Sequence, residues 1–264
     1  MSKPVIFSVI NQKGGVNKTT ISFNLGYLLS QKGAKVLMVD LDPQANLTIL
    51  CGIEPSTLEC SIADVLISYT KKERVPIEDC ILQISENLFV AGSIIDLSAA
   101  DTLLQGTMSR EYVLKKALNQ IADKFDFIII DCQPSLSLLP LNALACSSHV
   151  IVPCSTQYLA YRGLGLIEGT LEMVKENLNE NLELYGVIAT MVEKTLHSQE
   201  ILEFLQKDYN VIGTIPKSVK VSDAAYSQSG AITEFAPNSK PALAYEALAN
   251  KIYKDFCSEE QEEN

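Results

Sequence analysis

The sequence predicts an α/β fold in which a doubly wound, mostly parallel sheet carries helices on both faces. Short β-branched runs alternate with longer segments of helical periodicity along the 264 residues, as expected for repeated βαβ units. Two of the runs, Phe127–Asp131 and His149–Pro153, are almost continuously apolar, which is typical of parallel strands covered on both faces. With 47% hydrophobic and 20% charged residues, the chain can bury the core that such a sheet needs.

Seven strands and six helices can be placed on the sequence from its periodicity. The strands are expected at Val5–Ile10, Lys35–Asp40, Asn87–Ala91, Phe125–Asp131, His149–Pro153, Leu184–Thr190 and Val211–Ile215. The clearest helices are expected at Lys18–Gln31, Arg110–Lys124, Leu138–Cys146, Gly163–Asn177, Ser198–Asp208 and Pro241–Cys257. The region Cys51–Asp101 is the least regular, and we expect a helical excursion from the sheet there. A single domain is expected over residues 1–257, followed by an acidic, disordered tail at residues 258–264.

The chain is acidic, with 21 Lys and Arg against 32 Asp and Glu, a net charge of −11. This balance argues against capture of nucleic acid or anionic lipid by the whole surface, but it allows a local basic patch. No stretch reaches the roughly 18 apolar residues of a membrane span, and the run Val5–Ile10 is too short for the core of a signal peptide. The seven cysteines are odd in number and form no C-x-x-C pair, so we expect reduced thiols and no metal site.

The strongest functional motif is Asn11–Thr20, which reads NQKGGVNKTT between a predicted strand and a predicted helix. A glycine-rich loop in this position lets backbone N–H groups approach phosphate oxygens, and the helix N-terminus adds its positive dipole end. Lys18 can reach the β and γ phosphates, and the Thr19 hydroxyl can bind Mg²⁺. The loop departs from the G-x-x-x-x-G-K-[ST] pattern and fits the deviant Walker A form K-G-G-x-x-K-[ST], with an additional lysine at Lys13.

Carboxylates follow two of the predicted strands. Asp40 and Asp42 lie two residues apart at the end of one strand, so they point the same way at the carboxyl edge of the sheet, where open α/β sheets bind ligands. Asp131 ends the run IIID and suits a water-mediated contact to Mg²⁺. Together with the glycine-rich loop, these acids predict a site for a nucleotide with Mg²⁺.

With these motifs in order, the chain resembles the ParA/Soj branch of the deviant-Walker (MinD/ParA) P-loop ATPases, which act in plasmid and chromosome partitioning. The segments that carry the resemblance are NQKGGV, DLDPQAN, D-x-x-P-S-L-S, LNAL from Leu141 and IPKSVK from Ile215, so it extends from Val5 to about Phe256. The resemblance implies a P-loop NTPase fold with ATP and Mg²⁺ as cofactors. It also implies ATP hydrolysis by in-line attack of water, coupled to formation of an ATP-bound homodimer.

The resemblance assigns roles to individual residues of the nucleotide site. It implies that Lys13 crosses the dimer interface to the partner's ATP, and that Asp42 positions the attacking water. Asp40 and Asp131 support the Mg²⁺ side together with Thr19. The remaining residues implied to contact the nucleotide are Gly14, Gly15, Val16, Asn17, Lys18, Thr20 and, beside the adenine, Pro216.

Nonspecific DNA binding is also implied, through basic residues that match Lys194, Lys217 and Lys220. A ParB-like protein would stimulate hydrolysis, and the protein would act in the cytoplasm on the nucleoid or a plasmid. The four residues before Val5 leave no room for a helix-turn-helix, so operator-specific binding is not expected. A solvated lysine face remains the alternative for these three residues.

Two positions depart from the family pattern. Asn17 stands where relatives usually have glycine; if the backbone needs a positive φ there, Asn is the best-tolerated other residue. Gln133 stands where many relatives have proline. These departures leave open a same-fold regulator that binds ATP with little hydrolysis. A MinD-like membrane-cycling ATPase is less expected because the C-terminal helix ends in acidic residues. A metabolic enzyme of the dethiobiotin-synthetase type should lack Lys13.

Overall fold

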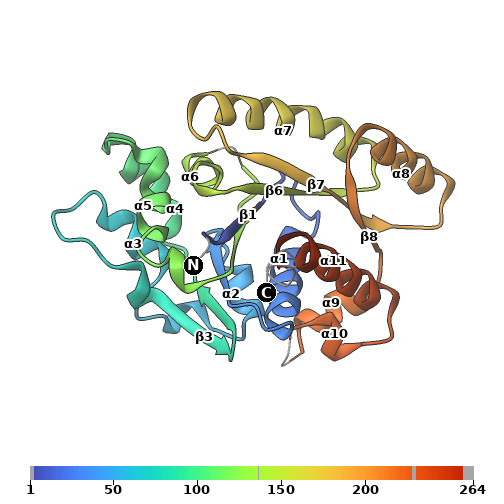
Figure 1. The fold of residues 1–264 in the computed structure, drawn as a ribbon, viewed down its shortest axis with the longest axis horizontal. Helices are drawn as coiled ribbons and strands as arrows, with labels where there is room; N and C mark the ends of the chain where they lie inside the picture. The colour runs from blue at the N-terminus through green and yellow to red at the C-terminus, as the bar shows by residue number, and fades with distance from the viewer. Residues whose placement is uncertain (1–2, 136, 228–229, 258–264) are drawn as a thin grey trace, which may run out of the picture.

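The structure, a computed structural model, describes residues 3–135, 137–227 and 230–257. Its strands form one eight-stranded sheet with the order β3-β4-β2-β5-β1-β6-β7-β8 (Figure 1). The bounds are β1 Val5–Val9, β2 Val36–Leu41, β3 Ile81–Ser85, β4 Leu88–Ala91, β5 Phe127–Cys132, β6 His149–Ser155, β7 Glu183–Val192 and β8 Val211–Pro216. β3 pairs antiparallel with β4, and the other strand pairs are parallel. The predicted doubly wound, mostly parallel sheet is therefore confirmed.

The helices that connect the strands cover both faces of the sheet. They are α1 Lys18–Gln31, α2 Asn46–Leu50, α3 Ile62–Ser68, α4 Leu97–Leu103, α5 Val113–Leu118, α6 Leu138–Cys146, α7 Tyr158–Asn177, α8 Leu196–Asp208, α9 Val219–Ala225, α10 Ile232–Phe235 and α11 Lys240–Cys257. Short 3-10 turns lie at Pro55–Thr57, Ile77–Cys80, Leu104–Gly106, Arg110–Tyr112 and Ala122–Lys124. Within the described ranges, no helix is long and apolar enough to cross a membrane.

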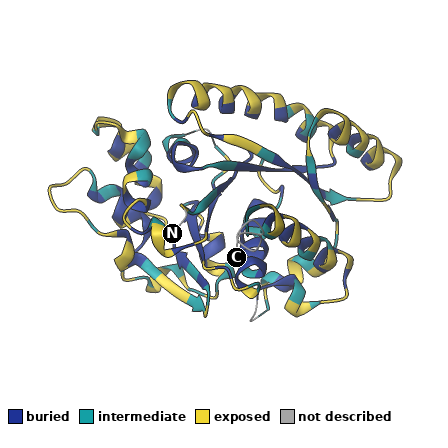
Figure 2. Cartoon of the chain, in the orientation of Figure 1, coloured by how far each residue is buried: buried dark blue, intermediate teal, exposed yellow. Residues whose placement is uncertain are grey.

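The central strands are buried (Figure 2), and their alternate residues belong to two separate hydrophobic clusters. In β5, Ile128 and Ile130 pack with α3 to α8, whereas Phe127 and Ile129 pack with α1, α2 and α9 to α11. This division follows from the two-residue period of a strand and explains why FIIID carries no polar alternation. The central strand β1 lies between β5 and β6, so the loop that follows β1 emerges at the middle of the sheet's carboxyl edge.

The predicted helix Arg110–Lys124 is broken in the structure, and Asn142 of α6 provides the physical reason. The buried Asn142 Nδ2 donates to the carbonyl of Arg110 at 2.9 Å, and its Oδ1 accepts from the amide of Leu114 at 3.1 Å. These two backbone groups would bond to each other in a continuous α-helix. The inserted side chain starts α5 at Val113, and a 3-10 turn at Ala122–Lys124 replaces the predicted last turn.

The irregular region Cys51–Asp101 was predicted to be helical, which is wrong in part. It contains α3 and α4, and β4 confirms the strand expected at Asn87–Ala91, but β3, which was not predicted, pairs with β4 in a hairpin at one edge of the sheet. The expectation of reduced thiols throughout is also wrong, because Cys60 and Cys80 of this region form a disulfide. The pair lies where the chain returns to the sheet at the start of β3.

The C-terminal helix α11 packs against α1 and β8 rather than extending into solvent (Figure 1). Tyr245, Leu248 and Ile252, at spacings of three and four, are fully or nearly fully buried against the sheet. Phe256 packs edge-on against His149, with ring centroids 4.9 Å apart. The apolar face of this helix is therefore part of the core. The predicted disordered tail at 258–264 lies outside the described residues.

Candidate functional site

The loop between β1 and α1 is anchored to the ends of β6 and β7. The Asn11 side chain accepts a hydrogen bond from the amide of Lys13 at 2.8 Å and donates one to the carbonyl of Pro153 at 2.7 Å. The Thr190 hydroxyl donates to the carbonyl of Val16 at 3.3 Å. These side-chain bonds fix an irregular backbone segment that has no ladder partners of its own.

Two residues of the loop adopt the left-handed conformation, Gly15 at φ 71° and Asn17 at φ 66°. Asparagine is among the few residues other than glycine that adopt it readily, so the condition stated for Asn17 is met. Asn17 precedes α1 without a side-chain capping bond, which leaves amide groups of the first turn free for a ligand. A Cβ on Gly14 or Gly15 would meet no atom within 4 Å, so open space lies over the loop.

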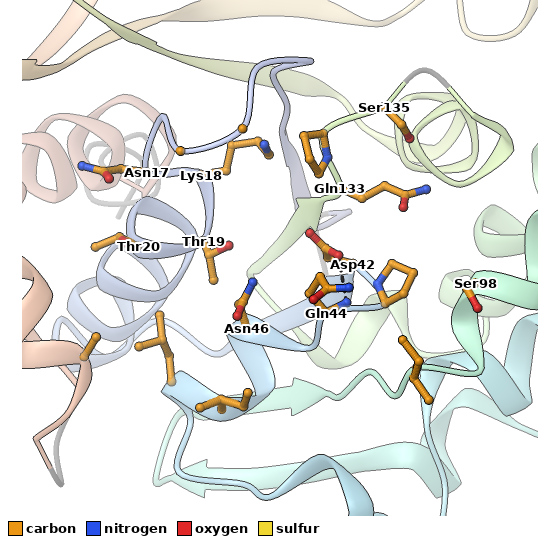
Figure 3. A pocket seen from close by; sticks show the side chains of 18 of the residues that line it. Asn17, Lys18, Thr19, Thr20, Asp42, Gln44, Asn46, Ser98, Gln133 and Ser135 are labelled. Carbon is orange, nitrogen blue, oxygen red and sulfur yellow. Dashed lines mark hydrogen bonds between the residues drawn. The ribbon is translucent and has the colours of Figure 1, made fainter.

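An open cavity of about 800 Å³ lies over this loop at the carboxyl edge of the sheet (Figure 3). It is lined by the loop and by the segments that follow β2, β4 and β5, together with the end of α9. The lining residues are Gly14, Gly15, Asn17, Lys18, Thr19, Thr20, Asp42, Pro43, Gln44, Asn46, Ile49, Leu50, Ile95, Ser98, Gln133, Pro134, Ser135, Ala225 and Tyr226. A polar, cradle-shaped floor with apolar walls suits a nucleoside with a charged phosphate chain.

Lys18 is buried at the floor of the cavity, and its Nζ lies 3.5 Å from the carbonyl oxygen of Lys13. Figure 3 shows its ammonium group directed toward the side of the opening that holds Gln133, whereas Asn17 points to the other side. Burial lowers the pKa of Lys18, and the carboxylates of Asp131 and Asp42 oppose that shift. A partly desolvated cation at a loop of free N–H groups is a strong attractor for phosphate.

Asp131 and Asp40 lie directly opposite each other on β5 and β2 and are both buried. Burial and then the charge of Asp40 raise the pKa of Asp131 to about 7, although the hydroxyls of Thr19 and Ser22 hydrogen bond to it, that of Ser22 at 2.9 Å. Burial likewise raises the pKa of Asp40 to about 6. Two buried carboxyls with raised pKa values indicate a site that gains from a nearby positive charge.

The three predicted acids hold different positions. Asp42 lines the cavity, and its Oδ1 accepts a hydrogen bond from the amide of Gln44 at 2.9 Å. Asp131 lies behind Thr19, as a contact through water or through the threonine hydroxyl requires. Asp40 faces away from the cavity lining, because its Oδ2 accepts from both the amide and the hydroxyl of Thr48, at 2.8 and 2.7 Å. Its observed contacts anchor α2.

The side chains of Thr19 and Asp131 are suited to a nucleotide that is bound together with Mg²⁺. Among the described residues, no group of three or more His, Cys, Asp or Glu side chains is placed to hold a metal ion. Mg²⁺ at nucleotide sites characteristically takes one or two protein ligands and fills its other positions with phosphate oxygens and water. Thr19, with Asp131 behind it, offers that small donor set.

Three predicted nucleotide contacts do not line the cavity. Val16 is buried in the core, and Pro216 at the end of β8 stands outside the lining, where Ala225 and Tyr226 of the following segment take its place. Lys13 turns outward, and its Nζ donates to Oε1 of Gln157 at 2.8 Å. The apolar lining residues Ile49 and Ile95 were not predicted, because they come from short segments around the irregular region.

The predicted DNA-contacting lysines are exposed and lie close to one another. Lys194 follows β7, and Lys217 and Lys220 follow the neighbouring β8. The amide of Lys217 bonds to the carbonyl of Val192 at 3.0 Å, which joins the two turns. The Lys217 ammonium pairs with Glu193 at 2.8 Å, so the patch is not purely basic.

Comparisons with known proteins agree with this geometry. A family model described as an AAA domain matches residues 4–184. The sporulation initiation inhibitor protein Soj of Bacillus subtilis is 38% identical over 254 residues, which cover 94% of this chain and 97% of that protein.

Two solved structures have similar folds and contain nucleotides. The cobyrinic acid a,c-diamide synthase of Mycobacterium smegmatis with bound ADP and magnesium has a TM-score of 0.80 and 33% identity, covering 95% of this chain and 94% of that one. A putative plasmid partition protein of Borrelia burgdorferi B31 bound to AMPPNP has a TM-score of 0.80 and 28% identity, covering 96% of this chain and 100% of that one.

Proposed function

The chain belongs to the ParA/MinD-type P-loop ATPases, and we propose that within this family it partitions plasmid or chromosome DNA by ATP-dependent dimerisation. It is an ATPase that uses ATP with Mg²⁺. The observation that carries the proposal is the loop KGGVNKT, in which Lys18 faces the cavity and the additional Lys13 faces outward. A second lysine turned away from its own cavity is suited to act on the nucleotide of another copy.

Hydrolysis in this site depends on positioning and electrostatics rather than on a covalent intermediate. The free amides of the loop and the Lys18 ammonium bind the phosphates and stabilise charge that develops on them. Thr19, with Asp131 behind it, would hold Mg²⁺, which would neutralise part of the phosphate charge. Asp42 lines the cavity, its Oδ1 accepts a hydrogen bond from the Gln44 amide, and its carboxylate would orient the attacking water molecule. We infer that turnover is slow until a second copy and a ParB-like partner engage.

Dimerisation would also change the DNA affinity. Lys194, Lys217 and Lys220 contribute few charges on a chain with a net charge of −11, and exposed ion pairs such as Lys217–Glu193 contribute little energy. Two copies of the patch on one dimer would double the number of phosphate contacts and steepen the salt dependence. The protein would therefore bind DNA nonspecifically in the ATP state, in the cytoplasm at the nucleoid or a plasmid.

A second candidate is a metabolic enzyme, which the similarity to the cobyrinic acid a,c-diamide synthase of Mycobacterium smegmatis favours. A same-fold regulator with little hydrolysis is a third. Retention of DNA on a filter, measured in ATP, ADP and no nucleotide, distinguishes the partition function from these two alternatives. The partition function predicts retention that requires ATP and disappears as salt rises, whereas DNA binding that is absent in every nucleotide state would contradict it.

The double change Lys217→Glu and Lys220→Glu is expected to abolish ATP-dependent DNA retention, a loss of at least about tenfold in affinity, because it reverses two phosphate contacts in each copy. Binding of a fluorescent ATP analogue should be unchanged, since neither side chain lines the cavity. The control is Lys71→Glu with Lys72→Glu, which makes the same change in net charge on an exposed loop after α3. An equal loss of DNA retention in both double variants would indicate that the DNA contact lies away from the turns after β7 and β8.

A further inference from the structure

The outward orientation of Lys13 is maintained by one side chain from a distant part of the sequence. Its Nζ bonds to Oε1 of Gln157, 144 residues further along the chain. Within residues 3–135, 137–227 and 230–257, Lys13 has no ion pair. A neutral amide oxygen can orient an ammonium group while leaving its charge uncompensated for another ligand.

Gln157 is itself fixed at the junction between β6 and α7. Its backbone N–H donates to the carbonyl of Ser155 at 2.7 Å. Its backbone carbonyl accepts from the N–H groups of Ala160 and Tyr161 in the first turn of α7. The preceding residue, Thr156, is buried, and its hydroxyl lies 2.6 Å from that of Ser198 on α8. The backbone that carries Gln157 is therefore held by bonds to three elements.

Lys13 is tied to the same strand end from the other side. Asn11 fixes the amide of Lys13 and bonds to Pro153 of β6, two residues before β6 ends. Both partners of the Lys13–Gln157 contact are therefore held in place by the same strand, β6. The Gln157 side chain makes no capping bond to α7, and among the described residues its hydrogen bond is the one with Lys13.

We propose that Gln157 is a positioning residue that holds the Lys13 ammonium outside its own cavity, presented to the phosphates of ATP in a second copy of this chain. The inference rests on the proposed function, because it requires an ATP-dependent dimer. Pre-orienting a flexible lysine removes part of the entropy cost that dimer formation would otherwise include. In this role Gln157 acts through its contact with Lys13.

Two substitutions of equal length separate positioning from folding. Gln157→Met keeps the shape but removes the acceptor, and Gln157→Glu keeps an acceptor oxygen. We expect Gln157→Met to raise the protein concentration for half-maximal dimerisation with a nonhydrolysable ATP analogue by about tenfold, the upper end of the cost of ordering one flexible side chain on association. Gln157→Glu should weaken dimerisation at least as much, because its carboxylate would neutralise the Lys13 ammonium and repel the phosphates of ATP in the second copy. Gln83→Met, at an exposed glutamine of β3 bonded within its own hairpin, is the control.

The affinity of monomeric protein for fluorescent ADP should be the same in all these chains, which a general defect of folding would not allow. If Gln157→Met reached half-maximal dimerisation at the same protein concentration as the wild type, the role of Gln157 would be wrong, but the proposed function would stand. Tighter dimerisation of Gln157→Met would also overturn the inference, because the hydrogen bond to Gln157 would then keep Lys13 away from the second copy. A wild-type protein that stays monomeric with the analogue would overturn the proposed function as well, so the two failures are distinguishable.

Discussion

Lys18→Ala is expected to reduce ATP turnover at least about a hundredfold, the typical cost of removing one preorganised charge from a transition-state site. Lys18 is buried beneath the cavity, where burial lowers its pKa and low polarity strengthens its attraction to phosphate. No other lysine lines the cavity, within the part of the chain that the structure describes. The measurement is steady-state release of phosphate at saturating ATP, together with the affinity for a fluorescent ATP analogue.

The control for this change is Lys254→Ala, at an exposed lysine of α11. It should leave turnover and melting temperature near the wild-type values. Since burial of an ammonium group costs free energy, Lys18→Ala should melt no lower than the wild type without nucleotide. Turnover within about threefold of the wild type would mean that Lys18 does not contact the reacting phosphate.

Asp131→Asn is expected to stabilise the nucleotide-free protein while impairing the reaction. The side chain is buried opposite Asp40, and its raised pKa shows that the ionised form is disfavoured. Removing that charge should raise the melting temperature at pH 8 by about 3–6 °C, and the weaker support of the metal side should lower Mg²⁺-dependent turnover by about 10–100-fold. Melting curves and turnover across a Mg²⁺ series measure both effects.

Ionisation of Asp131 also makes the free energy of unfolding depend on pH. The pKa of Asp131 rises from 3.8 to about 7 in the native state, so the native protein binds this proton more tightly than the unfolded chain. The free energy of unfolding therefore falls as pH rises from about 4 to about 7, and the loss is complete above that range. In Asp131→Asn this slope should flatten. An equal slope in both proteins would assign the pH dependence to other groups.

The sheet could be predicted because its strongest signals are local. Continuous apolar runs such as Phe127–Asp131 are typical of strands covered on both faces, and both faces are covered in the structure. The broken helix at Arg110–Lys124 could not be predicted, because the amide of Asn142 that interrupts it comes from another helix. The same holds for β3, whose residues form a strand through pairing with β4 at a sheet edge.

In the candidate site, the residues within motifs were predictable and their orientations were not. The spacing of Gly14 to Thr20 predicts a phosphate-binding loop, whereas the positive φ of Asn17 was stated only as a condition, which the structure meets. Asp40 and Asp42 share one strand face, yet the Thr48 side chain directs Asp40 to α2 and leaves Asp42 at the cavity. Likewise, only the folded chain brings Gln157 to Lys13. Contacts between segments decide these details.

Size-exclusion chromatography with light scattering tests the central claim most directly, namely that ATP converts this chain from a monomer to a dimer. The protein is measured in ADP, in ATP and in a nonhydrolysable ATP analogue, each with Mg²⁺. The account predicts the monomer mass in ADP and twice that mass in the analogue, with a mixture in ATP as hydrolysis proceeds. The monomer mass in all three conditions would contradict it.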